Sequence, residues 1–204
     1  MNAYLKKYFS NEDSYKKIEL IEKVTEIIFR NNMIIFGGMV KSLLASEMPN
    51  DIDIAYTDSI HLMTFLVEIK NLYKTEQQPS TYDHHNTKSF SIVIHVDNVK
   101  LKLDLINSKD IGKDIDFDVN GLIMDKKGSV SLANRLSDLL NLFDVIKNIQ
   151  AKQFNILKHI KNPETDNLYL VDFVKMQLRV SKMLSNGWSC VNSYQYLFLY
   201  LCYL

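Results

Sequence analysis

Two aspartates separated by one isoleucine, Asp51 and Asp53 in the segment DIDIAY, are the residues best placed to do chemistry. The segment alternates polar and apolar residues as a half-buried strand does, so both carboxylates should project from one face. Their Cα atoms would lie about 7 Å apart, and carboxylates that close repel each other unless a cation lies between them. A pair of Mg²⁺ ions would remove that repulsion, with Mn²⁺ as a substitute.

A third acid, Asp104 in the segment KLKLDLI, interrupts the apolar end of another predicted strand. Three carboxylates on neighbouring strands form the ligand set of a two-metal site. Such a site activates an attacking hydroxyl and stabilises the leaving oxygens in phosphoryl or nucleotidyl transfer. The sequence therefore predicts that Asp51, Asp53 and Asp104 are metal ligands and catalytic residues, with Asp104 also helping to deprotonate the acceptor hydroxyl.

The glycine pair Gly37-Gly38 stands between a short apolar run and a segment of helix-forming composition. Backbone N–H groups without neighbouring side chains can approach phosphate oxygens closely, and the positive end of the following helix favours an anion there. Lys41 adds a positive charge close to this bend. We therefore expect Gly37, Gly38 and Lys41 to hold the triphosphate of a nucleotide.

The segment FGGMVKSLLASEMPNDIDI, residues 36–54, resembles the head-domain signature of the class II CCA-adding tRNA nucleotidyltransferases and the related bacterial poly(A) polymerases. These enzymes form part of the DNA polymerase β-like nucleotidyltransferase superfamily. Downstream, DFDVNGLIMD (116–125) is similar to the family's RRDFTINALAYD segment. VDFVKMQLRVSKMLSNGW (171–188) is similar to the start of the EDxxR motif in the family's neck domain. The resemblance covers nearly the whole chain.

The resemblance implies further nucleotide-binding residues and a reaction. It places Asp116 and Asn120 in the nucleotide site, with Asp172 and Lys175 as the acidic and basic pair that reads the nucleobase edge. It implies ATP, with CTP as a second option, as the donor and an RNA 3′ end as the acceptor. Pyrophosphate would be the second product, and the protein would act in RNA processing.

Several positions depart from the family pattern. Lys41-Ser42 stands where the family has Arg-Asp, and Asp114-Ile115 where it has paired arginines, while no segment corresponds to the tRNA-holding body and tail domains. Lysine and arginine together number 24, as do aspartate and glutamate, so no overall charge attracts RNA. Two alternatives therefore stay open: a nucleotidyltransferase with a small-molecule or protein acceptor, and a degenerate, non-catalytic module that binds nucleotide.

Periodicity predicts the elements that would position these residues. We expect helices over 15–30, after Gly38 and over 59–73, strands at 33–36 and 51–56, a polar loop after 73, and a hairpin turning at Asp97-Asn98. From residue 131 the composition is helical, with long runs over 136–160 and 167–184. The predicted fold class is α+β: a nucleotidyltransferase head with a mixed central sheet (1–130), then an α-helical neck-like domain (131–204).

Composition sets the remaining expectations. The chain has 204 residues and two cysteines, Cys190 and Cys202, without metal-ligand spacing, which favours a reduced, cytoplasmic protein. No signal peptide and no membrane-spanning segment is expected. The aromatic segment YQYLFLYLCYL (194–204) would pack on the neck or form a homodimer interface, and the pair His84-His85 is interpreted as exposed loop residues.

Overall fold

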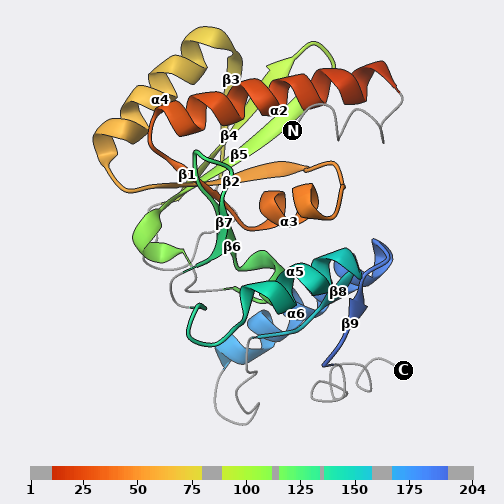
Figure 1. Cartoon of the computed structure of the whole chain (residues 1–204). Coiled ribbons are helices and arrows are strands. Elements are labelled where there is room, and N and C mark those ends of the chain that lie inside the picture. Colours follow the sequence, from red (N-terminus) through yellow and green to blue (C-terminus); the bar gives the residue numbers. More distant parts are fainter. Residues whose placement is uncertain (1–10, 80–88, 112–114, 134–135, 158–166, 193–204) are drawn as a thin grey trace.

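The computed structural model describes residues 11–79, 89–111, 115–133, 136–157 and 167–192, with the backbone alone at residues 110 and 167–173. Within these ranges the chain forms a seven-stranded mixed sheet in the order β3-β4-β5-β2-β1-β6-β7, with helices on both faces (Figure 1). The predicted α+β class with a mixed central sheet is confirmed. No helix in this part of the chain is long and apolar enough to cross a membrane.

Strands β2 and β5 run parallel at the centre of the sheet, and the other neighbouring pairs are antiparallel. The β4–β5 hairpin turns at Asp97, whose φ of 50° lies in the left-handed region that aspartate tolerates. The structure thus confirms the predicted hairpin turn at Asp97-Asn98 and the predicted strand at DIDIAY. The bounds are β1 Ile34–Phe36, β2 Asp51–Tyr56, β3 Lys74–Gln78, β4 Phe90–Val96, β5 Val99–Asn107, β6 Leu122–Met124 and β7 Val130–Leu132.

Two long helices, α2 (Glu12–Arg30) and α4 (Ser59–Leu72), cover one face of the sheet (Figure 1). Each begins at an N-cap side chain: Asn11 accepts a hydrogen bond from the backbone of Ser14, and Asp58 from that of Ile60. Alternate residues of β2 and β5 meet these helices in the main hydrophobic core, which includes Ile52, Ile54, Leu101, Leu103 and Leu105. The other residues of the two strands are left on the opposite face.

That opposite face carries the short helix α3 (Gly38–Leu44) and, beyond it, α5 (Leu142–Gln150) and α6 (Asn167–Ser185) (Figure 1). A two-stranded sheet, β8 (Gln153–Phe154) with β9 (Ser189–Cys190), joins these last two helices. The 3₁₀ turns are η1 (Ser108–Asp110) and η2 (Asp118–Asn120).

A buried carboxylate connects η2 to the helical part of the chain. Asp118, only 1% exposed, accepts hydrogen bonds from the backbone N–H groups of Val119 and Asn155 and from the side-chain amides of Asn148 and Asn155. Because four donors surround it, this charge is satisfied by hydrogen bonds. The segment 116–120 is thereby fixed to α5 and β8.

Two expectations about local structure were wrong. A continuous helix over 136–160 is not formed: α5 ends at Gln150, and Lys152, with φ 51°, turns the chain into β8. The polar segment after residue 73 contains the edge strand β3 rather than only a loop. Strand β7 begins at Val130, the last residue of the expected head domain, and that domain boundary stays a prediction. The His84-His85 and aromatic-segment interpretations lie outside the described residues.

Candidate active site

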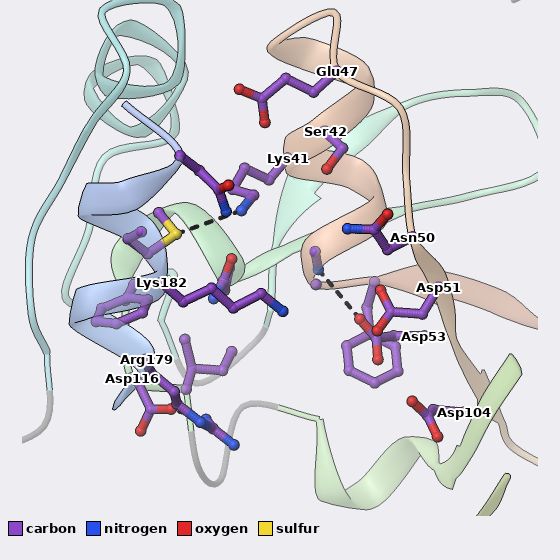
Figure 2. A pocket seen from close by; sticks show the side chains of 18 of the residues that line it. Lys41, Ser42, Glu47, Asn50, Asp51, Asp53, Asp104, Asp116, Arg179 and Lys182 are labelled. Carbon is purple, nitrogen blue, oxygen red and sulfur yellow. Dashed lines mark hydrogen bonds and ion pairs between the residues drawn. The ribbon is translucent and has the colours of Figure 1, made fainter. Parts of the chain in front are cut away.

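A cavity of about 550 Å³ opens between the acidic face of the sheet and helix α6. Figure 2 shows Asp51 and Asp53 from β2 and Asp104 from β5 on one side of it, with Arg179 and Lys182 from α6 on the other. The cavity therefore brings together acids and cations that are at least 75 residues apart in sequence. Its other polar lining residues are Lys41, Ser42, Glu47, Asn50, Asp116, Asn120 and Asn186.

The second acid of DIDIAY, Asp53, lies against the glycine bend. The backbone N–H of Gly38 donates to Asp53 Oδ2 at 3.2 Å, and Asp53 is 8% exposed. Gly37 has φ 70° and ψ −136°, a conformation that residues with a side chain rarely adopt. A Cβ at Gly37 would lie 2.8 Å from Asp53 Oδ2, so the glycine is required for the carboxylate to approach the backbone this closely.

The N–H groups that we expected to hold phosphate have partners within the chain. Gly37 donates to the carbonyl of Leu122 at 2.9 Å, and Gly38 donates to Asp53. In this structure the glycine pair thus supplies space for Asp53. Contact between the Gly38 N–H and a phosphate oxygen would require the Asp53 carboxylate to release that amide.

The third predicted acid lies beside Asp53, since the parallel register of β2 and β5 pairs Asp53 with Asp104. Asp104 is 2% exposed, and both of its carboxylate oxygens have partners. Ser91 Oγ donates to Oδ1, and Lys102 Nζ lies 2.9 Å from Oδ2. Among the described side chains, no three carboxylate, imidazole or thiol groups converge as a set of metal ligands.

The chemistry of the acids nevertheless fits a hard divalent cation. Carboxylate oxygens are the ligands that Mg²⁺ prefers, and Asp51 and Asp53 face one cavity from the same side of β2. Asp53 is largely buried, and a buried carboxylate is stabilised by a nearby cation. Asp51 and Asp53 are the residues that would hold such an ion.

Lys41 lies deep in the cavity, against the end of α6. Its Nζ is 4.9 Å from the centre of the Trp188 ring and 3.6 Å from Met183 Sδ. Burial lowers the pKa of the Lys41 ammonium, an effect that the charges of Glu47, Asp51 and Asp53 partly oppose. The ammonium is therefore poorly solvated, as suits a group that binds an incoming anion.

Helix α6 contributes two cations that the sequence analysis missed. Arg179 forms an ion pair with the buried carboxylate of Asp116, and Lys182 extends from the same helix towards the cavity (Figure 2). The resemblance had suggested Lys175, which is exposed and does not line the cavity, and Asp172, whose side chain is outside the described residues. Helical spacing could have indicated the two cations, because Arg179, Lys182 and Met183 share one face of α6.

Solved structures with this arrangement of elements are CCA-adding enzymes. A CCA-adding enzyme with ATP aligns with a TM-score of 0.56 and 16% identity over 96% of this chain and 43% of its own. The fold is that of the CCA-adding enzymes. The Thermotoga maritima CCA-adding enzyme complexed with tRNA-CCA aligns with a TM-score of 0.57 and 16% identity over 96% of this chain and 43% of its own.

A tRNA-processing enzyme in an apo form also aligns with this chain, with a TM-score of 0.51 and 14% identity over 93% of this chain and 46% of its own. The present chain thus spans less than half the length of the structures that it matches. No protein-family model and no curated protein matches the sequence.

Proposed function

We propose that this chain is a metal-dependent nucleotidyltransferase that transfers a nucleoside monophosphate from ATP or CTP to the 3′-hydroxyl of an RNA. The observation that carries the proposal is the contact between Asp53 and the glycine bend, because it sets a pair of acids beside Lys41 in one cavity. The CCA-adding enzyme fold and its solved complexes with ATP, CTP and tRNA support it.

In this proposal the residues of α3 and α6 bind the donor nucleotide. Lys41 and Lys182 would contact the triphosphate, since both line the cavity opposite the acids. Asn120 Oδ1 is buried, with no hydrogen-bond partner among the described residues, and an N–H of a nucleobase would satisfy it. The exocyclic amines of adenine and cytosine are donors of that kind.

The acids of β2 and β5 would act on the acceptor. The acceptor oxygen forms a bond to the α-phosphorus, the bond from the α-phosphorus to the oxygen that bridges it to the β-phosphorus breaks, and pyrophosphate leaves. The proton of the hydroxyl passes to a carboxylate of the site, for which we propose Asp104. Mg²⁺ held by Asp51 and Asp53 would stabilise the negative charge that develops on the phosphate oxygens.

A transfer assay tests the proposal. The protein is incubated with Mg²⁺, each labelled nucleoside triphosphate in turn, and either tRNA lacking its terminal residues, generic RNA or no RNA. We expect labelled RNA from ATP or CTP, and a loss of roughly 10³-fold or more in Asp53→Asn. Asp97→Asn is the matched control, because Asp97 lies in the exposed turn of the hairpin and asparagine tolerates its backbone conformation.

Two outcomes would contradict the proposal, and one further measurement would support it. Label on the protein, or on a small molecule without RNA, would indicate a different acceptor. Absence of any transfer, together with intact nucleotide binding, would indicate a non-catalytic nucleotide-binding module. A steep fall of RNA labelling with salt would support RNA as the acceptor, because contacts with the phosphate backbone impose that dependence.

A further inference from the structure

Lys102 and Asp104 form a charge pair on the acidic face of the sheet. They are two residues apart on β5, so their side chains leave the strand on the same side. The register of the parallel pair places Lys102 beside Asp51 and Asp104 beside Asp53. A lysine therefore stands within the group of acids to which the sequence assigned two divalent ions.

The pair is well enclosed. The Lys102 side chain is 25% exposed and that of Asp104 is 2% exposed, and their charged atoms are 2.9 Å apart. Ser91, from the neighbouring strand β4, donates to the other Asp104 oxygen. With little water to screen it, the attraction between the ammonium and the carboxylate is stronger than at an open surface.

A divalent ion at Asp104 would have to displace this ammonium or lie within a few ångströms of it. Displacement breaks an enclosed charge pair, and close approach brings two cations together, so both arrangements are unfavourable. Asp51 and Asp53 also line the cavity, and both are more exposed than Asp104. Of the three acids, Asp104 is thus the least able to bind a metal ion.

We propose that Lys102 supplies the cation at Asp104, so that the site binds one divalent ion tightly, at Asp51 and Asp53, instead of two ions shared by three acids. The inference rests on the proposed function, because that function places a divalent ion in the cavity. Lys102 would act as a positioning residue: it holds the Asp104 carboxylate in place and neutralises its charge without a second metal.

The test is the number of Mn²⁺ ions that the protein binds, measured by electron paramagnetic resonance titration with Mn²⁺ alone. We expect one tight ion per wild-type chain, which is lost in Asp53→Asn and kept in Asp104→Asn. Lys102→Met should bind a second ion or bind Mn²⁺ about tenfold more tightly, because a repelling charge is gone and Asp104 is released. Lys102→Arg, which keeps the charge, should behave as the wild type does.

Lys100→Met is the matched control, since Lys100 is an exposed lysine on the same strand and the same face and its removal changes the net charge equally. Two tight ions in the wild type, one of which Asp104→Asn removes, would overturn the inference. Identical binding by Lys102→Met and Lys100→Met would also overturn it. Asp104→Asn keeps the test decisive if Lys102→Met fails to fold.

The titration also separates this inference from the proposed function. One tight ion in a chain that transfers no nucleotide would reject the function and leave the role of Lys102 intact. Two tight ions in an active chain would reject the role of Lys102 and leave the function intact. A wild-type chain that binds no Mn²⁺ would reject both.

Discussion

The ammonium of Lys41 lies 4.9 Å from the centre of the Trp188 ring, which links helix α3 to the segment that follows α6. A cation over an indole ring is attracted by the negative face of the ring, and burial strengthens that attraction. Lys41 is also the cation nearest to the glycine bend in sequence. A phosphate that attracts Lys41 would therefore change the surroundings of Trp188.

Nucleotide binding should be visible in the fluorescence of this tryptophan, which is the only one in the sequence. We expect ATP to change the Trp188 emission in the wild type, because the ammonium moves relative to the ring, and to cause little change in Lys41→Met. Lys126→Met, at an exposed turn, serves as the control. Emission that stays constant while dialysis detects bound ATP would contradict the expectation.

Lys41→Met should stabilise the protein at neutral pH and weaken nucleotide binding. Burial lowers the pKa of Lys41 from its usual 10.5, so between the lowered value and 10.5 the unfolded chain binds more protons than the folded chain. The stability of the wild type therefore rises with pH in that window, while below it the cost of burying the ammonium is fully present.

We expect the Tm of Lys41→Met to exceed that of the wild type by about 2 °C at pH 7. The difference should shrink as pH rises towards 10.5, the usual pKa of lysine. Scanning calorimetry at several pH values measures it. A difference that grows with pH would show that the pKa of Lys41 is not lowered in the folded protein.

Gly37→Ala should reduce transfer activity far more than Gly128→Ala does. Both glycines have positive φ, 70° and 76°, so each alanine adds backbone strain, about 1–3 kcal/mol. At Gly37 the new Cβ would lie 2.8 Å from Asp53 Oδ2, whereas a Cβ added at Gly128 would have no other atom within 4 Å. Moving that carboxylate should cost about 10²-fold in rate.

Denaturant unfolding measures the backbone strain in these glycine variants, and the transfer assay measures the effect of displacing the Asp53 carboxylate. A loss of stability in both variants, together with a large loss of activity in Gly37→Ala alone, is the expected pattern. Equal activity in both variants would mean that the position of Asp53 does not matter for transfer.

Removing Arg179 should destabilise the protein more than neutralising its partner does. The Asp116 side chain is 7% exposed and that of Arg179 is 50% exposed. Arg179→Gln leaves a buried carboxylate unpaired, at a cost of about 2 kcal/mol, whereas Asp116→Asn leaves an arginine that water can solvate, at a cost below about 1 kcal/mol. Urea denaturation of both single variants and the double variant gives these values. Equal losses would contradict this account.

The elements around the acids could be predicted from sequence because their patterns are local. Alternation in DIDIAY and in the segments flanking Asp97 identifies strands, and the spacing of apolar residues over 15–30 identifies a helix. The alternation of polar and apolar residues could not predict strand β3, because KTEQQ is polar throughout. This segment becomes a strand by pairing with β4 at the edge of the sheet. The run over 136–160 had helical composition, but contacts distant in sequence end α5: Phe154 pairs with Cys190.

In the candidate site, too, some residues could be predicted from the sequence and others could not. The neighbourhood of Asp53 and the glycine bend was predictable, since both belong to one short motif. The pairing of Asp104 with Lys102 was not, because alternation shows that they share a face but not that one neutralises the other. Arg179 was missed because the resemblance directed attention to Lys175, whereas the packing of α6 decides which of its residues reach the cavity.

The four hydrogen bonds to Asp118 bear on how the molecule can be divided. A fragment that ends at residue 130 would keep this carboxylate but lose Asn148 and Asn155, which supply three of those bonds. The Phe117 ring, which packs against Phe154 in the intact protein, would also lose its cover and face water. Excision at the apparent head–neck junction should therefore yield an aggregation-prone piece, and the intact chain should melt in a single cooperative step.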